Sequence, residues 1–243
     1  MTTAPAADQL RLLDVQAIDT RLAQLAHQRK THPSIAALEE LSRRAEDLQR
    51  AKTANEVLIS DIRRELTKAE TDVEQVATRA DRDKKRLEAG SGSAKDLQAL
   101  ASEVESLAKR QSDLEEVQLE VMERMDTAQS EATAIAEQYE ALDADIQRTT
   151  TERDQALAEL DAQIEENQAK RAKAAEGIDE NLMKLYERVR SKTGGLAAVA
   201  LRGTMADGMQ LPLSLTEKDA IANADPDEVI RSEDYDYILV RVE

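Results

Sequence analysis

The sequence predicts a mainly α protein, a long antiparallel coiled-coil hairpin followed by a small C-terminal α+β domain. Three observations support this fold class. Charged residues make up 34% of the 243 residues, and Phe, Trp and Cys are absent. Apolar residues recur in steps of three and four along two long segments, and a Gly-Ser run separates those segments. Ala, Leu, Glu, Lys and Arg with heptad periodicity are typical of long coiled-coil helices, whose two-helix core needs few aromatic rings.

The first predicted helix covers about residues 6–31. An apolar stripe on it comprises Val15, Ile18, Leu22 and Leu25. Pro33 is expected to end this helix, and Ser34 to cap the next one.

The second predicted helix covers residues 34–88. Its seam positions follow a strict 3.5-residue period, which a solitary helix of 3.6 residues per turn does not maintain, so a supercoiled partner is expected. Twelve of the fifteen seam residues are apolar, and together they are Leu38, Leu41, Ala45, Leu48, Lys52, Asn55, Ile59, Ile62, Leu66, Ala69, Val73, Val76, Ala80, Asp83 and Leu87. The polar members Lys52 and Asn55, with Gln111 and Gln118 of the returning segment, are expected to fix the register.

The pattern restarts after a tip at 89–94 and predicts a returning helix over about 94–175. A link this short joins antiparallel neighbours, and Ser93 with Asp96 resembles a capping box. The outgoing helix would span roughly 80 Å at about 1.5 Å per residue. The longer returning helix leaves its base free to pack against the N-terminal helix. The returning seam is expected to include Leu97, Leu100, Val104, Leu107, Gln111, Leu114, Gln118, Val121, Met125, Ala128, Ala132, Ile135, Tyr139, Leu142, Ile146, Thr149, Arg153, Ala156 and Leu160.

A shorter helix is predicted over 178–191, and Gly194-Gly195 then marks a change in composition. Residues 1–193 are therefore assigned to the hairpin and 194–243 to a small second domain. Within the latter, 197–201, 209–213 and 237–242 are expected to be strands and 216–224 a short helix. Tyr186, Tyr235 and Tyr237 are candidates for the contact between this domain and the preceding helix.

Composition and charge limit the classes of function that the chain can have. The formal charge of −17 disfavours a protein that binds nucleic acid mainly through phosphate contacts. No apolar run approaches the roughly 20 residues of a membrane span, and the N-terminus lacks signal-peptide features, so a cytoplasmic protein without membrane contact is expected. No nucleophile–base set, carboxylate pocket or nucleotide motif is evident, and His27 and His32 have no partners at metal-ligand spacing. We therefore predict a non-enzyme with no cofactor.

The hairpin tip is the one basic segment of an acidic chain. This pattern has two interpretations: a solvated helix end whose cations suit the helix dipole, or a docking site for an acidic protein surface or a nucleic-acid backbone. The candidate partner-binding residues at the tip are Arg79, Arg82, Lys84, Lys85, Arg86 and Lys95.

An ordered set of short motifs resembles the bacterial C4-type zinc-ribbon proteins that carry a long N-terminal coiled-coil hairpin. The motifs are QLRLLD at 9–14, KDL at 95–97, RQSDLE at 110–115 and PDEVIR at 226–231, so the resemblance covers nearly the whole chain. It implies a ribbon with two Cys-x-x-Cys pairs. Counted from Pro226, the ligand positions fall at Ala206, Met209, Ser232 and Tyr235, none of which supplies a thiolate. The resemblance therefore implies a degenerate, metal-free ribbon-like domain.

The same family is associated with protein partners, including an alternative sigma factor, and sometimes with RNA. Residues 194–243 contain four basic and ten acidic side chains, which weakens the RNA interpretation. The sequence therefore predicts a scaffold or adaptor that binds protein partners. The alternative is a nucleic-acid-binding regulator of the zinc-ribbon type. Either a monomer or a homodimer is compatible with the hairpin, because exposed apolar flanks could pair into a four-helix assembly.

Overall fold

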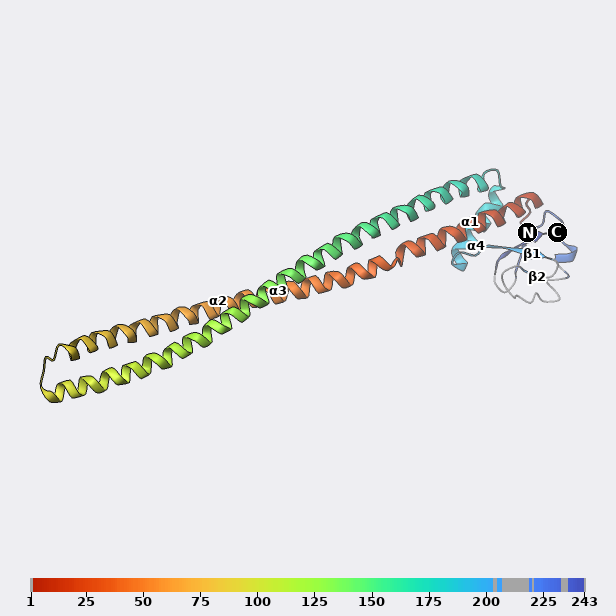
Figure 1. Cartoon of the computed structure of the whole chain (residues 1–243). Coiled ribbons are helices and arrows are strands. Elements are labelled where there is room, and N and C mark those ends of the chain that lie inside the picture. Colours follow the sequence, from red (N-terminus) through yellow and green to blue (C-terminus); the bar gives the residue numbers. More distant parts are fainter. Residues whose placement is uncertain (1, 203–204, 207–218, 220, 233–235, 243) are drawn as a thin grey trace. The chain divides into compact units, whose positions relative to one another are not determined.

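The computed structural model describes residues 2–202, 205–206, 219, 221–232 and 236–242. It confirms a mainly α chain with a long helical hairpin and a small C-terminal sheet (Figure 1). Two compact units are present, residues 1–36 with 150–243, and residues 37–149. This division differs from the predicted boundary at residue 193, because the N-terminal helix and the base of the returning helix pack in the same unit as the sheet.

The unit 37–149 is an antiparallel pair of helices, formed from α2 (Pro33–Glu88) and α3 (Ala94–Ala175). Contacts between residues far apart in sequence fix the direction of pairing. Arg124 is 2.7 Å from Glu65, and Arg79 near the end of α2 pairs with Glu103 near the start of α3. One partner number rises as the other falls, as an antiparallel register requires.

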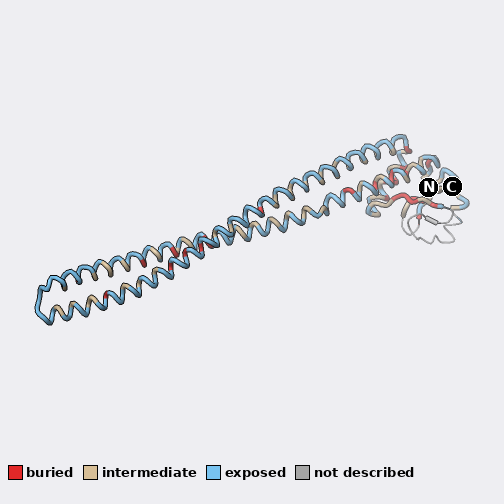
Figure 2. The backbone as a smooth tube through the Cα atoms, viewed as in Figure 1, coloured by how far each residue is buried: buried red, intermediate tan, exposed pale blue. Residues whose placement is uncertain are grey.

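Burial within this unit follows the predicted seam, since non-exposed residues recur at the heptad positions of both helices (Figure 2). The buried seam residues are Asn55, Ile62, Ala69, Asp83, Leu107, Val121, Met125, Ala128 and Leu142. Two seam predictions are wrong. Lys52 is exposed, and Tyr139 retains 40% of its surface. Both side chains carry a polar end on an apolar stem, and such residues keep that end in water when a two-helix core is thin.

The junction of the first two helices corrects the predicted cap. α1 covers Ala6–Lys30, and α2 begins at Pro33, so Pro33 opens the second helix instead of ending the first. Ser34 lies in the first turn of α2. The ring of His32 accepts the Ser34 N–H through Nδ1 at 3.4 Å, so the histidine occupies the capping position.

The other unit places α1 beside the base of α3, as predicted. Arg29 Nε lies 2.6 Å from Asp161 Oδ1, and Arg21 donates to Gln163 at 3.3 Å. This contact lowers the pKa of Asp161 below its usual range, through the hydrogen bond from Arg29. α4 (Glu180–Thr193) follows, with Asp179 as its N-cap and Gly194 in the left-handed conformation at its end.

The sheet contains four strands, β1 (Ala198–Arg202), β2 (Met205–Ala206), β3 (Ile230–Arg231) and β4 (Ile238–Val242), in the order β2-β1-β4-β3. β1 and β4 are parallel, with Ala198 opposite Ile238, and the two outer pairings are antiparallel. The predicted strands 197–201 and 237–242 are therefore confirmed. The predicted strand 209–213 and four residues of the predicted helix 216–224 lie outside the described residues, and of the remaining five, residues 219 and 221–223 are helical.

One apolar cluster joins the helices to the sheet. Its members come from α1, α4, β1 and β4, and include Leu12, Val15, Leu182, Leu185, Tyr186, Val189, Ala198, Ile238 and Val240. The N-terminal residues also join this unit, since Thr3 forms an antiparallel bridge with Glu228 and the Ala4 N–H donates to the Asp227 carbonyl at 2.8 Å. The small sheet thus packs on α4, which directly precedes it, and on α1 from the other end of the sequence. Within the described ranges, no helix has an apolar stretch long enough to cross a bilayer.

Candidate functional site

The tip turn is formed by two glycines and a reciprocal cap. Gly90 and Gly92 have backbone φ angles of 61° and 143°, which residues other than glycine rarely adopt. The Ser93 hydroxyl donates to Asp96 Oδ2 at 2.7 Å, the Ser93 N–H donates to the same oxygen at 3.1 Å, and the Asp96 N–H returns to Ser93 Oγ at 3.3 Å. The predicted capping box is therefore confirmed. Hydrogen bonds from Ser93 lower the pKa of the Asp96 carboxyl below its usual range.

A buried carboxylate lies next to the tip and engages its arginines. Asp83 occupies a seam position and is 3% exposed. Arg79, Arg82 and Arg86 lie at 3.8, 3.8 and 3.6 Å from its oxygens. Three cations thus share one buried carboxylate, while their guanidinium groups extend to the surface, where more than half of each side chain is exposed.

The lysines of the tip differ from its arginines. Lys84, Lys85 and Lys95 are exposed, and within the part of the chain that the structure describes none of them makes an ion pair. The six predicted tip residues therefore fall into two groups: arginines that form ion pairs with Asp83, and lysines whose charge is available to a partner. Whether any of them binds a partner stays a prediction.

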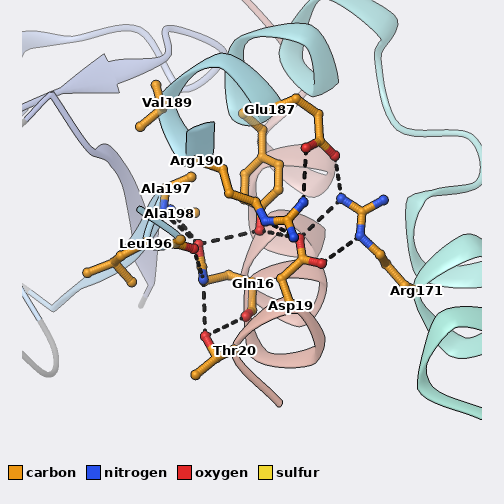
Figure 3. A network of polar contacts seen from close by, with 12 residues as sticks. Gln16, Asp19, Thr20, Arg171, Glu187, Val189, Arg190, Leu196, Ala197 and Ala198 are labelled. Carbon is orange, nitrogen blue, oxygen red and sulfur yellow. Dashed lines mark hydrogen bonds and ion pairs between the residues drawn. The ribbon is translucent and has the colours of Figure 1, made fainter. Parts of the chain in front are cut away.

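A second polar cluster lies between the helices at the base and was not predicted from the sequence. Asp19 on α1 has a side chain that is 1% exposed. Arg171 of α3 binds it through two hydrogen bonds of 2.6 and 3.1 Å, and the Tyr186 hydroxyl donates to Asp19 Oδ2 at 2.8 Å (Figure 3). Arg190 lies 3.4 Å away, and Glu187 pairs with both arginines. Burial raises the pKa of Tyr186 above its usual range, so its hydroxyl stays a donor.

Gln16 extends this cluster to the first strand. Its Oε1 accepts the N–H groups of Ala197 and Ala198 at 2.6 and 3.1 Å (Figure 3). Its Nε2 donates to the Gly195 carbonyl at 3.0 Å. Gln16 and Asp19 are three residues apart and share a helix face with Leu12 and Val15. A polar pair interrupting that apolar stripe was the only sequence signal for this cluster, and its partners, more than 150 positions away, gave none. The arrangement anchors α1, α3, α4 and β1 to one another.

The four positions implied for zinc ligands do not fit a metal. Ala206 lies in β2, and Ser232 is 5% exposed, its N–H donating to the Tyr237 carbonyl. Met209 and Tyr235 lie outside the described residues, and no thiolate is available at any of the four positions. In the described ranges no group of three or more His, Asp or Glu residues is arranged to hold a metal ion.

An arginine organises the loop that precedes β3. The Arg241 guanidinium donates to the carbonyl oxygens of Ala224, Asp225, Pro226 and Glu228, at 3.1, 2.7, 2.8 and 3.2 Å. This is the PDEVIR segment noted in the sequence, and the N-terminal residues bind to it. A fixed guanidinium with several donors thus orders a loop by hydrogen bonding.

Comparisons with known proteins agree with this architecture. The sequence profile of the CT398-like coiled coil hairpin domain matches residues 15–194. An uncharacterized protein of Mycobacterium tuberculosis is 32% identical over 99% of this chain and 98% of its own length. A solved structure from Mycobacterium smegmatis superposes with a TM-score of 0.83 at 29% identity, covering 99% of this chain and 100% of the other. CT398 from Chlamydia trachomatis superposes with a TM-score of 0.73 at 14% identity, covering 97% and 98%, which is a likeness of fold alone.

Proposed function

Because this chain belongs to the family of CT398-like coiled-coil hairpin proteins, we propose that it is a non-enzymatic scaffold or adaptor that binds a protein partner at the tip of its hairpin. The main support for this proposal is that the arginines and the lysines of the tip differ in their ion pairs. The arginines are engaged by Asp83, while Lys84, Lys85 and Lys95 are exposed and unpaired within the described residues.

The chemistry of the tip favours an acidic protein surface as its partner. A cluster of lysines attracts carboxylates over a Debye length and accelerates their encounter. The rest of the chain is acidic enough to bring the total to −17, so an extended polyanion such as RNA would be repelled along the helices beyond the tip. A compact acidic patch, by contrast, can meet the tip alone. The small C-terminal domain, which we regard as a metal-free ribbon-like unit, would provide a further docking surface.

Two charge-reversal variants, one at the tip and one elsewhere on the hairpin, test the proposal. Lys84, Lys85 and Lys95 are changed to Glu in the full chain, and the matched control changes Lys52, Lys68 and Lys109, which are exposed on the hairpin away from the tip. Both variants alter the charge equally. Each protein is used to capture partners from native cells, followed by quantitative mass spectrometry.

We expect the tip variant to lose its principal partners by about tenfold or more, since charge reversal at a contact removes attraction and adds repulsion. The control should retain them. Equal capture by the tip variant and the unmodified protein would reject the tip as the contact. Tight RNA binding in a gel shift that persists at high salt would instead support the nucleic-acid alternative.

A further inference from the structure

A shallow groove runs along one side of the hairpin, in the middle of the unit 37–149. Its volume is about 370 Å³. The apolar lining consists of Leu58, Ile62 and Ala128, with Ile62 and Ala128 at the bottom, both only 2% exposed. Leu58 forms the wall and keeps 44% of its surface exposed, and its neighbour Val57 keeps 57%. The groove therefore offers apolar surface to solvent at a point where two helices already lie side by side.

The rim of this groove is negatively charged. Glu120, Glu123 and Glu131 line it together with Arg124 and Thr127. The charge of Arg124 is already engaged by Glu65 at 2.7 Å. Residues 113–145 of α3 contain eleven acidic side chains and no basic one except Arg124. This charge favours a cationic occupant over an acidic one, because a cation can pair with these carboxylates whereas an anion would be repelled.

A polar atom beside the groove lacks a partner. Asn55 is 7% exposed, and its Nδ2 donates to Glu131 Oε2 at 3.3 Å. Its Oδ1 accepts no hydrogen bond from the described residues. A buried acceptor without a donor costs about 1–3 kcal/mol. Glu131, which lines the groove, is thus bound by a seam residue that has an unsatisfied oxygen of its own.

We propose that this groove is a second interaction surface, which takes a cationic amphipathic helix of a partner protein. Apolar side chains of that helix would pack on Leu58 and Ile62, and lysines or arginines would pair with Glu120, Glu123 and Glu131. A third helix laid between two packed helices follows ordinary helix packing and the helix-in-groove mode of recognition.

A second copy of this chain fits the groove poorly. Its basic helical segment is residues 79–86, and the seam side of that segment packs against its own hairpin, with Asp83 buried there. That segment therefore has no free apolar side to insert. The helices α1 and α4 of a second copy carry a small net positive charge, but their apolar sides are buried in the cluster with the sheet. The helix α3 is strongly acidic and would be repelled by the rim.

The probe is a fluorescein-labelled 18-residue peptide of leucine and lysine, with leucines at i, i+3, i+4 and i+7, titrated with the full chain. The rim variant carries Glu120→Lys, Glu123→Lys and Glu131→Lys. Its control carries Glu105→Lys, Glu116→Lys and Glu137→Lys, which are exposed residues of the same helix outside the groove. Leu58→Asn tests the apolar wall, and Leu119→Asn, at a leucine that is 60% exposed outside the groove, is its control. Thermal unfolding monitors the fold of each variant.

We expect the rim variant to weaken peptide binding by about tenfold or more and its control by about threefold or less. Leu58→Asn should weaken binding by about fivefold, Leu119→Asn should leave it unchanged, and the tip variant at Lys84, Lys85 and Lys95 should still bind. Equal weakening by the rim variant and its control would overturn the proposal in favour of diffuse attraction. Unchanged binding by Leu58→Asn would overturn it too, as would light scattering showing a dimer that Leu58→Asn dissociates.

Discussion

Replacing Asp19 by Asn should selectively destabilise the unit that contains the sheet. The substitution keeps the shape of the side chain and removes its charge. Asp19 is 1% exposed on its side chain and accepts two hydrogen bonds from Arg171 and one from Tyr186. In the variant, an amide group would face guanidinium donors, and two half-buried cations, Arg171 and Arg190, would lose their shared carboxylate.

The magnitude follows from burial and from the remaining partners. Breaking a buried ion pair by removing one member costs about 3–5 kcal/mol. Here Arg171 and Arg190 keep Glu187, and their side chains are 24% and 35% exposed, so water solvates them partly. We therefore expect the low end of that range, about 3 kcal/mol of unfolding free energy for this unit.

Hydrogen exchange of the α4 amides is the appropriate assay, because circular dichroism at 222 nm would be dominated by the long helices. The matched control is Asp47→Asn, whose pair with Arg50 leaves the two side chains 69% and 72% exposed. An exposed pair contributes about 0.5 kcal/mol or less. Equal α4 protection in Asp19→Asn and Asp47→Asn would refute the role assigned to the buried cluster.

Three further predictions concern single side chains. Asn55→Leu should raise the unfolding free energy by about 1 kcal/mol, and with it the urea midpoint of the full chain, because it fills a seam position and removes an unpaired acceptor; an unchanged or lower midpoint would contradict this. Arg241→Lys should lower the hydrogen-exchange protection of β4 by about 2 kcal/mol, since one ammonium cannot replace a guanidinium spread over four carbonyls, whereas full protection would show that the loop is held otherwise. The pKa of Asp96 is lowered in the folded chain, so its stabilisation of the tip is present above the ordinary value of 3.8 and is lost as pH falls below the lowered pKa. Titration of the Ser93 amide by NMR should show this acid transition in the unmodified chain and not in Asp96→Asn.

The parts of the fold that depend on local sequence were predictable. The 3.5-residue period predicted seam residues such as Ile62 and Val121, because a coiled coil repeats a single geometry. The Ser93–Asp96 pair predicted the turn, because its hydrogen bonds join near neighbours in the sequence. The failures have equally local causes. At Lys52 and Tyr139 the periodicity was correct, but it could not show that a thin core lets such side chains reach water.

Contacts between residues far apart in the sequence could not be predicted. Nothing in a single sequence pairs Gln16 with Ala197, or Asp19 with Arg171, since these contacts exist only after the N-terminal helix, the base of α3 and the sheet have packed together. The role of Arg241 was hidden for the same reason, as one basic residue in a strand gives no sign of the four carbonyls that it binds. The difference between the lysines and arginines of the tip likewise required the position of Asp83.

Both proposed surfaces depend on the antiparallel register of α2 and α3, and a single cross-linking measurement tests it. The chain has no cysteine, so Glu65→Cys with Arg124→Cys introduces one unique pair at a site where the native side chains are 2.7 Å apart. The 2.7 Å separates the ends of two long side chains, so a short bis-maleimide linker is used to join the two thiols in place of a direct disulfide. At low protein concentration this linker should give an intramolecular cross-link and a faster-migrating monomer on a denaturing gel. Predominantly dimeric product, or failure to cross-link in a folded chain, would contradict the register on which the tip and the groove rest.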